Sequence, residues 1–433
     1  SYLTSVVIPV SLTSIGHYAF YECHNLNKAV FASIKSLCEI NMGSNPLAYA
    51  HHLYIYDEEI INLIIPDDVT SIGSCTFSGC SHIKSVTIPN SVTYIGSGAF
   101  RRCDSIETLT YNTNAIGRVF SGNKSIKNIN IGESVTSISD SAFWGCNGLS
   151  AIIIPNSITE IGDWAFCQCL GLSSIIIGNS VKYIGQSAFT GCNNLSYMIM
   201  GNSIETIEKE AFKDCGNLLS LNIPDSVKKI GSYAFYNCIG ITSLVIPNSV
   251  NSIGYNAFLA CKNLKSITIP NSVTHIGVNA FDYCDNIETI SINTTIIDST
   301  FNYKPSIKTI NIGDCVKNIG NAAFERCYGI TTIKIPNSVI EIGNDAFQDC
   351  QSLQQIIIPN SVTKIGKNAF YGCCNLSSIE IPDSVIHIDY SAFSHCSKLK
   401  SINIPKSITN ISNWLFFDCN SLISVIIPDS VTK

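Results

Sequence analysis

Cysteine is the residue type that offers this sequence the most chemistry, because a thiol can form a disulfide, hold a metal or act as a nucleophile. The chain has 433 residues, of which 20 are Cys, and fifteen of these stand three residues after a Phe. Four successive pairs are Phe143 and Cys146, Phe166 and Cys169, Phe189 and Cys192, and Phe212 and Cys215. A slot repeated in this way asks for a small apolar side chain in a core, which a free Cys supplies. We therefore predict a structural ladder of buried thiols, although cysteines about 5 Å apart in neighbouring repeats would lie within disulfide range.

Histidines and acidic residues could also supply metal ligands, but their spacing argues against it. His51 and His52 are adjacent and precede Asp57 and Glu58. Adjacent residues of a strand point to opposite faces, so the two histidines are poor co-ligands. Acidic residues at the corners of the chain, such as Asp225, lack the spacing of a calcium loop. We therefore expect no metal site and no cofactor.

The sequence contains no recognisable catalytic motif. It has no G-x-S-x-G, no H-E-x-x-H, no phosphate-binding loop and no dinucleotide fingerprint. We therefore predict no catalytic residues and a protein that is not an enzyme. The net charge is -6, and no run of Lys or Arg suggests a nucleic-acid partner. No stretch of 18 apolar residues occurs, so we expect no membrane insertion within this sequence.

A fixed spacing of prolines reveals the elements that position these residues. Pro66 and Pro89 are 23 residues apart, and the same spacing recurs from Pro336 to Pro428, with the unit I-P-N-S-V-T-x-I-G-x-x-A-F-x-x-C-x-x-L-x-x-I-x. Such a period is typical of a solenoid. Alternating apolar residues before the proline predict a short strand, V-T-x-I a second extended piece, and A-F-x-x-C a tight 3₁₀-like or short helical turn. Glu208 and Asp389 replace the Gly after the inner Ile, so this position does not demand a positive φ.

The repeat runs from end to end, which predicts a single tandem-repeat domain at 1–433. Both ends fall within a repeat, so we expect a fragment whose targeting and anchoring segments lie outside it. Residues 33–59 form an irregular interruption. Residues 112–131 and 293–312 are short repeats of 20 residues, which we expect to keep the strand side and to shorten the opposite wall.

The unit I-P-x-S-V-T-x-I-G-x-x-A-F-x-x-C-x-x-L resembles the BspA-type leucine-rich repeats of microbial surface proteins. The resemblance covers nearly the whole chain and includes the interruption around Asn45–Leu53. It implies a curved right-handed leucine-rich-repeat solenoid of short parallel strands, and a cell-surface or secreted location. Several relatives are regarded as adhesins for host matrix proteins or other microbes. The family motif itself carries no catalytic residue.

One surface feature stands out on the strand side of the repeat. The outward position of three successive strands is Ile153, Ile176 and Ile199, with Tyr197 beside them. A contiguous exposed apolar patch can mark a binding site, whereas the alternative is the ordinary β-propensity of a regular sheet. We predict that these four residues bind a ligand.

These observations favour a non-catalytic extracellular binding or adhesion module. It would engage host matrix or other cell-surface proteins through its strand face. One alternative is an intracellular protein-interaction scaffold, which thiol-rich repeats without disulfides would tolerate. Another is a carrier repeat array attached to a catalytic or binding domain outside this fragment.

Overall fold

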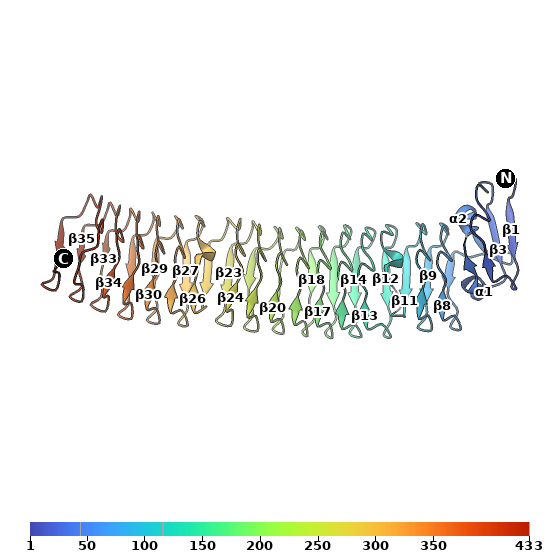
Figure 1. The fold of residues 1–433 in the computed structure, drawn as a ribbon, viewed down its shortest axis with the longest axis horizontal. Coiled ribbons are helices and arrows are strands. Elements are labelled where there is room, and N and C mark those ends of the chain that lie inside the picture. Colours follow the sequence, from blue (N-terminus) through green and yellow to red (C-terminus); the bar gives the residue numbers. More distant parts are fainter. Residues whose placement is uncertain (44, 115–116, 433) are drawn as a thin grey trace. The chain divides into compact units, whose positions relative to one another are not determined.

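The computed structural model describes residues 1–43, 45–114 and 117–432. The chain divides into two compact units, Ser1–Leu219 and Ser220–Lys433. Each unit is a stack of coils in which one wall carries the longer strands and another wall carries strands of two residues (Figure 1). The repeat is about 23 residues long, as expected for a leucine-rich-repeat solenoid. The outward surface of the longer strands is called the strand face below.

The first unit contains most of the irregular features. Its longer strands are β1 (Ser5–Ile8), β3 (Lys28–Phe31), β5 (Leu53–Ile55), β7 (Asn62–Ile64), β9 (Ser85–Ile88), β11 (Thr108–Tyr111), β12 (Asn128–Ile131), β14 (Ala151–Ile154), β16 (Ser174–Ile177) and β18 (Tyr197–Ile199). The two-residue strands are β2 (Ser14–Ile15), β4 (Asn41–Met42), β8 (Ser71–Ile72), β10 (Tyr94–Ile95), β13 (Ser137–Ile138), β15 (Glu160–Ile161), β17 (Tyr183–Ile184) and β19 (Thr206–Ile207). Neighbouring coils pair in parallel, except for one hairpin described below.

The second unit repeats the same plan. Its longer strands are β21 (Ser243–Val245), β23 (Ser266–Ile269), β25 (Thr289–Ile292), β27 (Thr309–Ile312), β29 (Thr332–Lys334), β31 (Gln355–Ile357), β35 (Ser401–Asn403) and β36 (Ser424–Ile426), and the same wall includes the shorter β33 (Ser378–Ile379). The two-residue strands are β20 (Lys229–Ile230), β22 (Ser252–Ile253), β24 (His275–Ile276), β26 (Ile296–Ile297), β28 (Asn318–Ile319), β30 (Glu341–Ile342), β32 (Lys364–Ile365) and β34 (His387–Ile388). Pairing between coils is again parallel.

The core of each coil is filled by the Phe of the repeat. Phe143, Phe166, Phe189 and Phe212 are fully buried. The ring centroids of Phe166 and Phe189 lie 5.3 Å apart with an interplanar angle of 2°. The Ala before each Phe is buried as well. A small residue beside a large one at the same place in every coil allows identical layers to pack closely.

The A-F-x-x-C segment is a series of tight turns in most coils. Within the described residues, 3₁₀ helices occur only at η1 (Arg118–Phe120) and η2 (Ser299–Phe301), in the two short repeats. Elsewhere the residues before the Ala and before the Cys are left-handed, as at Trp164 (φ 53°) and Gln168 (φ 59°). A left-handed residue interrupts a helix. The freed N–H groups bond between coils instead, since the Phe143 N–H donates to the Ala165 carbonyl at 2.8 Å.

Close packing explains why the residue after the inner Ile is Gly in most repeats. Its φ is not in the left-handed region at Gly96, in agreement with the prediction from Glu208 and Asp389. A Cβ at Gly96 would lie 2.3 Å from the Ser74 backbone nitrogen of the preceding coil. Glycine therefore serves here to let two backbones approach each other closely.

The irregular block at 33–59 contains two short helices, the two-residue strand β4 and a hairpin, while residue 44 lies outside the described residues. Helix α1 (Ile34–Glu39) begins with a capping box of two serines, and α2 (Leu47–Ala50) ends at left-handed His51 (φ 61°). β5 then pairs antiparallel with β6 (Glu58–Glu59). The free edge of β5 is thus paired with β6, and β7 starts a separate sheet. No helix among the described residues is long and apolar enough to cross a membrane.

The two short repeats keep their strands in register with their neighbours. Leu109 pairs with Ile129 and Ile290 with Ile310, each across 20 residues. The strand side is therefore continuous there, while residues 115–116 of the first short repeat lie outside the described part of the chain. In the second short repeat the opposite wall keeps a two-residue strand, β26.

Candidate functional site

The four predicted surface residues come together on the strand face of the first unit. Ile153 pairs in register with Ile176, and Ile176 with Ile199, across β14, β16 and β18. The three side chains are 66%, 37% and 43% exposed. Alternation along each strand explains this, because Ile152 and Ile175 point into the core while their neighbours point outward. The result is an unbroken row of three exposed isoleucines.

Tyr197 extends this row on the same face. It lies at the start of β18, two residues before Ile199, and is 54% exposed. It pairs in register with Ser174, a small residue that leaves the ring uncovered. These four residues, Ile153, Ile176, Tyr197 and Ile199, are called the isoleucine row below.

The three strands before the isoleucine row, β9, β11 and β12, are polar at the same outward position. Thr87 pairs with Thr110, and Thr110 with Asn130. The Asn130 amide donates to the Thr110 hydroxyl at 3.4 Å. The outward position therefore changes from polar in β12 to apolar in β14, and this change sets one limit of the isoleucine row.

A second feature of the strand face, in the second unit, was not predicted. A hollow of about 690 Å³ lies over β31, β33, β35 and β36 and is lined by Ile357, Glu380 and Asn403, among others. The Asn403 amide donates to the Ile381 carbonyl at 2.8 Å, and its oxygen accepts from the Ile381 N–H. The Asn403 side chain thus takes the place of a backbone-to-backbone hydrogen bond next to β33, which has only two residues. The signal in the sequence was Glu380, at a position that is apolar, Thr, Ser or Asn in most repeats.

The ladder cysteines have a role that their size alone does not explain. Their thiols donate to the carbonyl of the Phe in the preceding coil, 26 residues before the Cys, as from Cys169 to Phe143 at 3.1 Å. The same bond runs from Cys146, Cys192 and Cys215 to Phe120, Phe166 and Phe189, at 3.4, 3.2 and 3.3 Å respectively. A weak donor that is small enough for the core therefore satisfies a buried carbonyl. The described cysteines are all free thiols.

These thiols are poorly suited to nucleophilic chemistry. Burial raises the pKa of Cys146 to about 12, and that of Cys192 to about 12 as well. Burial also raises the pKa of Cys169 far above its ordinary value, and the neighbouring thiols raise it further. The thiolate is the reactive form, so at neutral pH these groups remain protonated and inert. The ladder thiols of the regular coils therefore provide no activated nucleophile.

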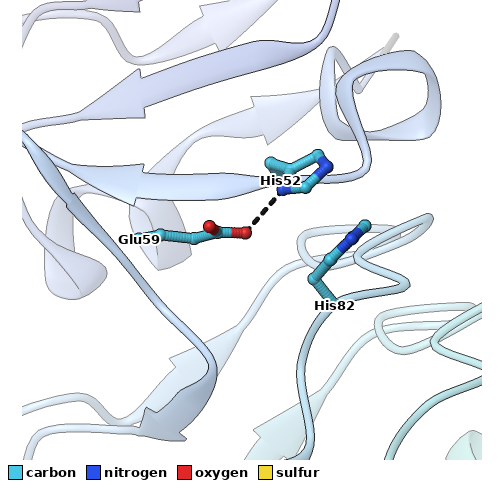
Figure 2. A group of neighbouring side chains, drawn as sticks. All are labelled: His52, Glu59 and His82. Atoms are coloured by element: carbon cyan, nitrogen blue, oxygen red, sulfur yellow. Dashed lines mark hydrogen bonds and ion pairs between the residues drawn. The ribbon is translucent and has the colours of Figure 1, made fainter.

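The residues weighed as metal ligands in the sequence do not converge as a set. The His51 ring nitrogen lies 3.1 Å from the Gly79 carbonyl, and Asp57 lies 3.9 Å from the Lys28 ammonium. His52 instead meets Glu59 and His82, and one ligand atom from each of these three lies within 4.8 Å of the other two (Figure 2). Sequence reasoning did not consider this trio, because His82 lies 30 residues beyond His52 and carries no motif.

Stacked coils with one longer parallel strand each and a buried Phe–Cys turn define a leucine-rich-repeat solenoid. The family model described as BspA type leucine rich repeat region (6 copies) matches residues 1–117, 116–241, 205–331 and 317–433. Together these matches span the chain, which therefore belongs to the BspA-type leucine-rich-repeat family.

Solved structures of bacterial repeat proteins are similar to this chain. A leucine-rich repeat protein from Bacteroides ovatus is 31% identical, with a TM-score of 0.60, over 75% of this chain and 88% of that one. A leucine rich cell surface protein from Faecalibacterium prausnitzii is 27% identical, with a TM-score of 0.30, over 84% of this chain and 87% of that one. A search of curated protein sequences found no match.

Proposed function

We propose that this chain is a non-catalytic, extracellular binding module of a microbial surface protein. It engages a protein ligand through the strand face at 149–200. The observation that carries the proposal is the isoleucine row, whose three isoleucines are exposed and paired in register. The partners proposed are host matrix proteins or other cell-surface proteins, which the resemblance to BspA-type repeats implies.

The energetics of such a surface favour a protein ligand. Covering an exposed aliphatic or aromatic side chain contributes roughly 1.5–3 kcal/mol for complete burial. Aromatic residues near the centre of an interface carry a large share of the binding energy, and Tyr197 supplies one beside Ile199. The backbone pairing holds these side chains on a rigid lattice, so little conformational entropy is lost on binding.

Two alternative functions can be distinguished from this proposal by experiment. An intracellular scaffold would use the same surface for an internal partner, and the full-length gene would then encode no signal peptide. A carrier array would leave the strand face without a ligand and place the activity in a neighbouring domain. Both share the solenoid, so only the binding partner and the cellular location separate them from an adhesin.

The test is binding by the double variant Ile176→Lys with Tyr197→Ala. The matched control is Leu170→Lys with Tyr183→Ala, because Leu170 and Tyr183 are 40% and 46% exposed in the same unit but lie off the strand face. After unchanged melting is verified for both, each is assayed on immobilised extracellular-matrix proteins and on host cells. We expect the strand-face variant to lose at least about tenfold in affinity, or about 1.4 kcal/mol, and the control to bind normally. Undiminished binding by the strand-face variant would place the site elsewhere.

A further inference from the structure

Two histidines and a glutamate gather where the irregular block meets the next coil. His52 immediately precedes β5, and Glu59 ends β6, the other strand of the hairpin. His82 comes from the turn before β9 and reaches the same place (Figure 2). The Ile60 N–H donates to the Leu53 carbonyl at 2.8 Å, which closes the hairpin and fixes His52 close to Glu59. Three potential ligands are thus held by two separate parts of the backbone.

The contacts among the three side chains are short. A His52 ring nitrogen, Nδ1, lies 2.5 Å from a Glu59 carboxylate oxygen. The ring centroids of His52 and His82 are 3.6 Å apart, and the rings are tilted by 29°. The side chains of His52 and Glu59 are 30% and 29% exposed, while His82 is exposed. The group is therefore open to an ion from solvent and is still partly shielded from water.

We propose that His52, Glu59 and His82 bind a divalent transition-metal ion, with Zn²⁺ as the best-fitting ion. Zinc accepts imidazole nitrogen and carboxylate oxygen at about 2.0–2.2 Å, so ligand atoms around a tetrahedral ion lie about 3.3 Å apart. The distances found here, from 2.5 Å to at most 4.8 Å, bracket that value. Two imidazoles and one carboxylate leave a fourth position for water.

Binding requires a small rearrangement that the surroundings permit. The lone pairs of two stacked rings run nearly parallel, so the His82 ring must tilt away from His52 until both nitrogens face one ion. His82 is exposed on a turn and has room to rotate. Desolvation lowers the pKa of His82, and the neighbouring His52 lowers it further. A neutral imidazole is the form that binds a metal, and a lowered pKa favours that form.

The ion would join two parts of the first unit that no strand ladder connects at this point. The strand sheet stops at the β5–β6 hairpin, and β7 begins a new sheet. On the other side of the block, the buried Asn45 amide donates to the carbonyls of Cys75, Thr76 and Ser78. A metal at His52, Glu59 and His82 would fasten the hairpin end to the same coil region that Asn45 fastens at the helix end.

The experiment is a calorimetric titration of the full chain with ZnCl₂, after the accessible thiols have been alkylated in the native state. We expect one equivalent of Zn²⁺ to bind and to raise the melting temperature. His82→Gln and Glu59→Gln should each raise the Kd by at least about tenfold. Glu58→Gln, on the same strand, and His387→Gln, on β34, are the matched controls and should bind like the parent.

Cobalt provides a second readout that distinguishes the proposed ligands from cysteine. Co²⁺ bound by His52, Glu59 and His82 should give visible bands without sulfur-to-metal charge transfer, and His82→Gln should abolish them. Absence of saturable Zn²⁺ binding by the parent chain would overturn the proposal. Equal binding by the parent and both ligand variants, or a cobalt spectrum dominated by thiolate, would overturn it as well.

Discussion

The regular coils at 132–215 and the irregular block at 33–59 belong to the same unit, yet they place polar groups in opposite ways. In the coils, the inward slots are uniform, and the Cys169 thiol serves a backbone carbonyl inside the core. In the block, the buried amide of Asn45 donates to three backbone carbonyls of the next coil, those of Cys75, Thr76 and Ser78. Its histidine and carboxylate groups gather near the surface.

The difference shows where this solenoid can acquire a site. A slot that recurs in every coil is fixed by stacking, because a change there disturbs two neighbours. The outward positions of the strands and the irregular block escape this constraint. Ile153 and Ile176 can therefore differ from Thr87 and Thr110 at the equivalent outward position without loss of packing.

The largest effect is expected from breaking the regular core. Phe166→Ala removes a fully buried ring that stacks on both neighbours, at 5.4 Å and 5.3 Å between centroids. It should lower the free energy of unfolding by about 3–5 kcal/mol in urea titrations under reducing conditions. Tyr183→Ala removes a 46% exposed ring and should change it by less than about 0.5 kcal/mol. Similar losses in the two variants would contradict the assignment of the core.

A smaller effect is expected from the buried amide of the irregular block. Asn45→Ala leaves the carbonyls of Cys75, Thr76 and Ser78 without their donor and should cost about 1–3 kcal/mol. Hydrogen exchange should speed up at α2 and leave the coils at 132–215 unchanged. The control is Asn41→Ala, an exposed residue of the same block. Uniform acceleration along the unit would show that block and coils unfold as one.

High pH should destabilise the regular coils through their ladder thiols. The pKa values of Cys146 and Cys192 are about 12 when folded, against an ordinary value of 9.0. Between these values the unfolded chain has lost protons that the folded chain keeps, so stability falls as pH rises above 9. Each such thiol contributes a slope of up to about 1.4 kcal/mol per pH unit.

The measurement is urea unfolding between pH 8 and pH 10.5 in a reductant. The variant Cys146→Ala with Cys192→Ala should show a shallower decline than the parent. The control, Cys315→Ala with Cys374→Ala, removes two half-buried cysteines outside the ladder. Equal slopes in all three proteins would mean that the ladder thiols do not titrate as buried groups.

The repeating features could be predicted from the sequence because each of them recurs in many repeats. The spacing of Phe166 and Cys169 recurs in coil after coil, so it indicates a core slot without any further knowledge. The strand period of two then places Ile153 and Ile176 outward. The family resemblance agrees with these deductions, since the whole chain matches the BspA-type repeat model.

Features that depend on a single path of the backbone could not be predicted. Trp164 and Gln168 adopt left-handed conformations, but the positions they occupy hold many residue types and so give no signal. The approach of His82 to His52 depends on the path of the hairpin. The rule that adjacent residues of a strand point to opposite faces does not describe that path. The thiol bond to Phe143 was missed because the Cys slot was interpreted by size alone.

The most direct test of the central claim is photo-crosslinking from the strand face itself. A benzophenone amino acid is placed at Ile176 in one protein and at Leu170 in another, two sites of comparable exposure in one unit. Each protein is irradiated with the matrix protein that the parent binds most tightly, and the products are identified by mass spectrometry. We expect a crosslink from position 176 and none from position 170. A crosslink of equal yield from both, or only from position 170, would contradict binding at the isoleucine row.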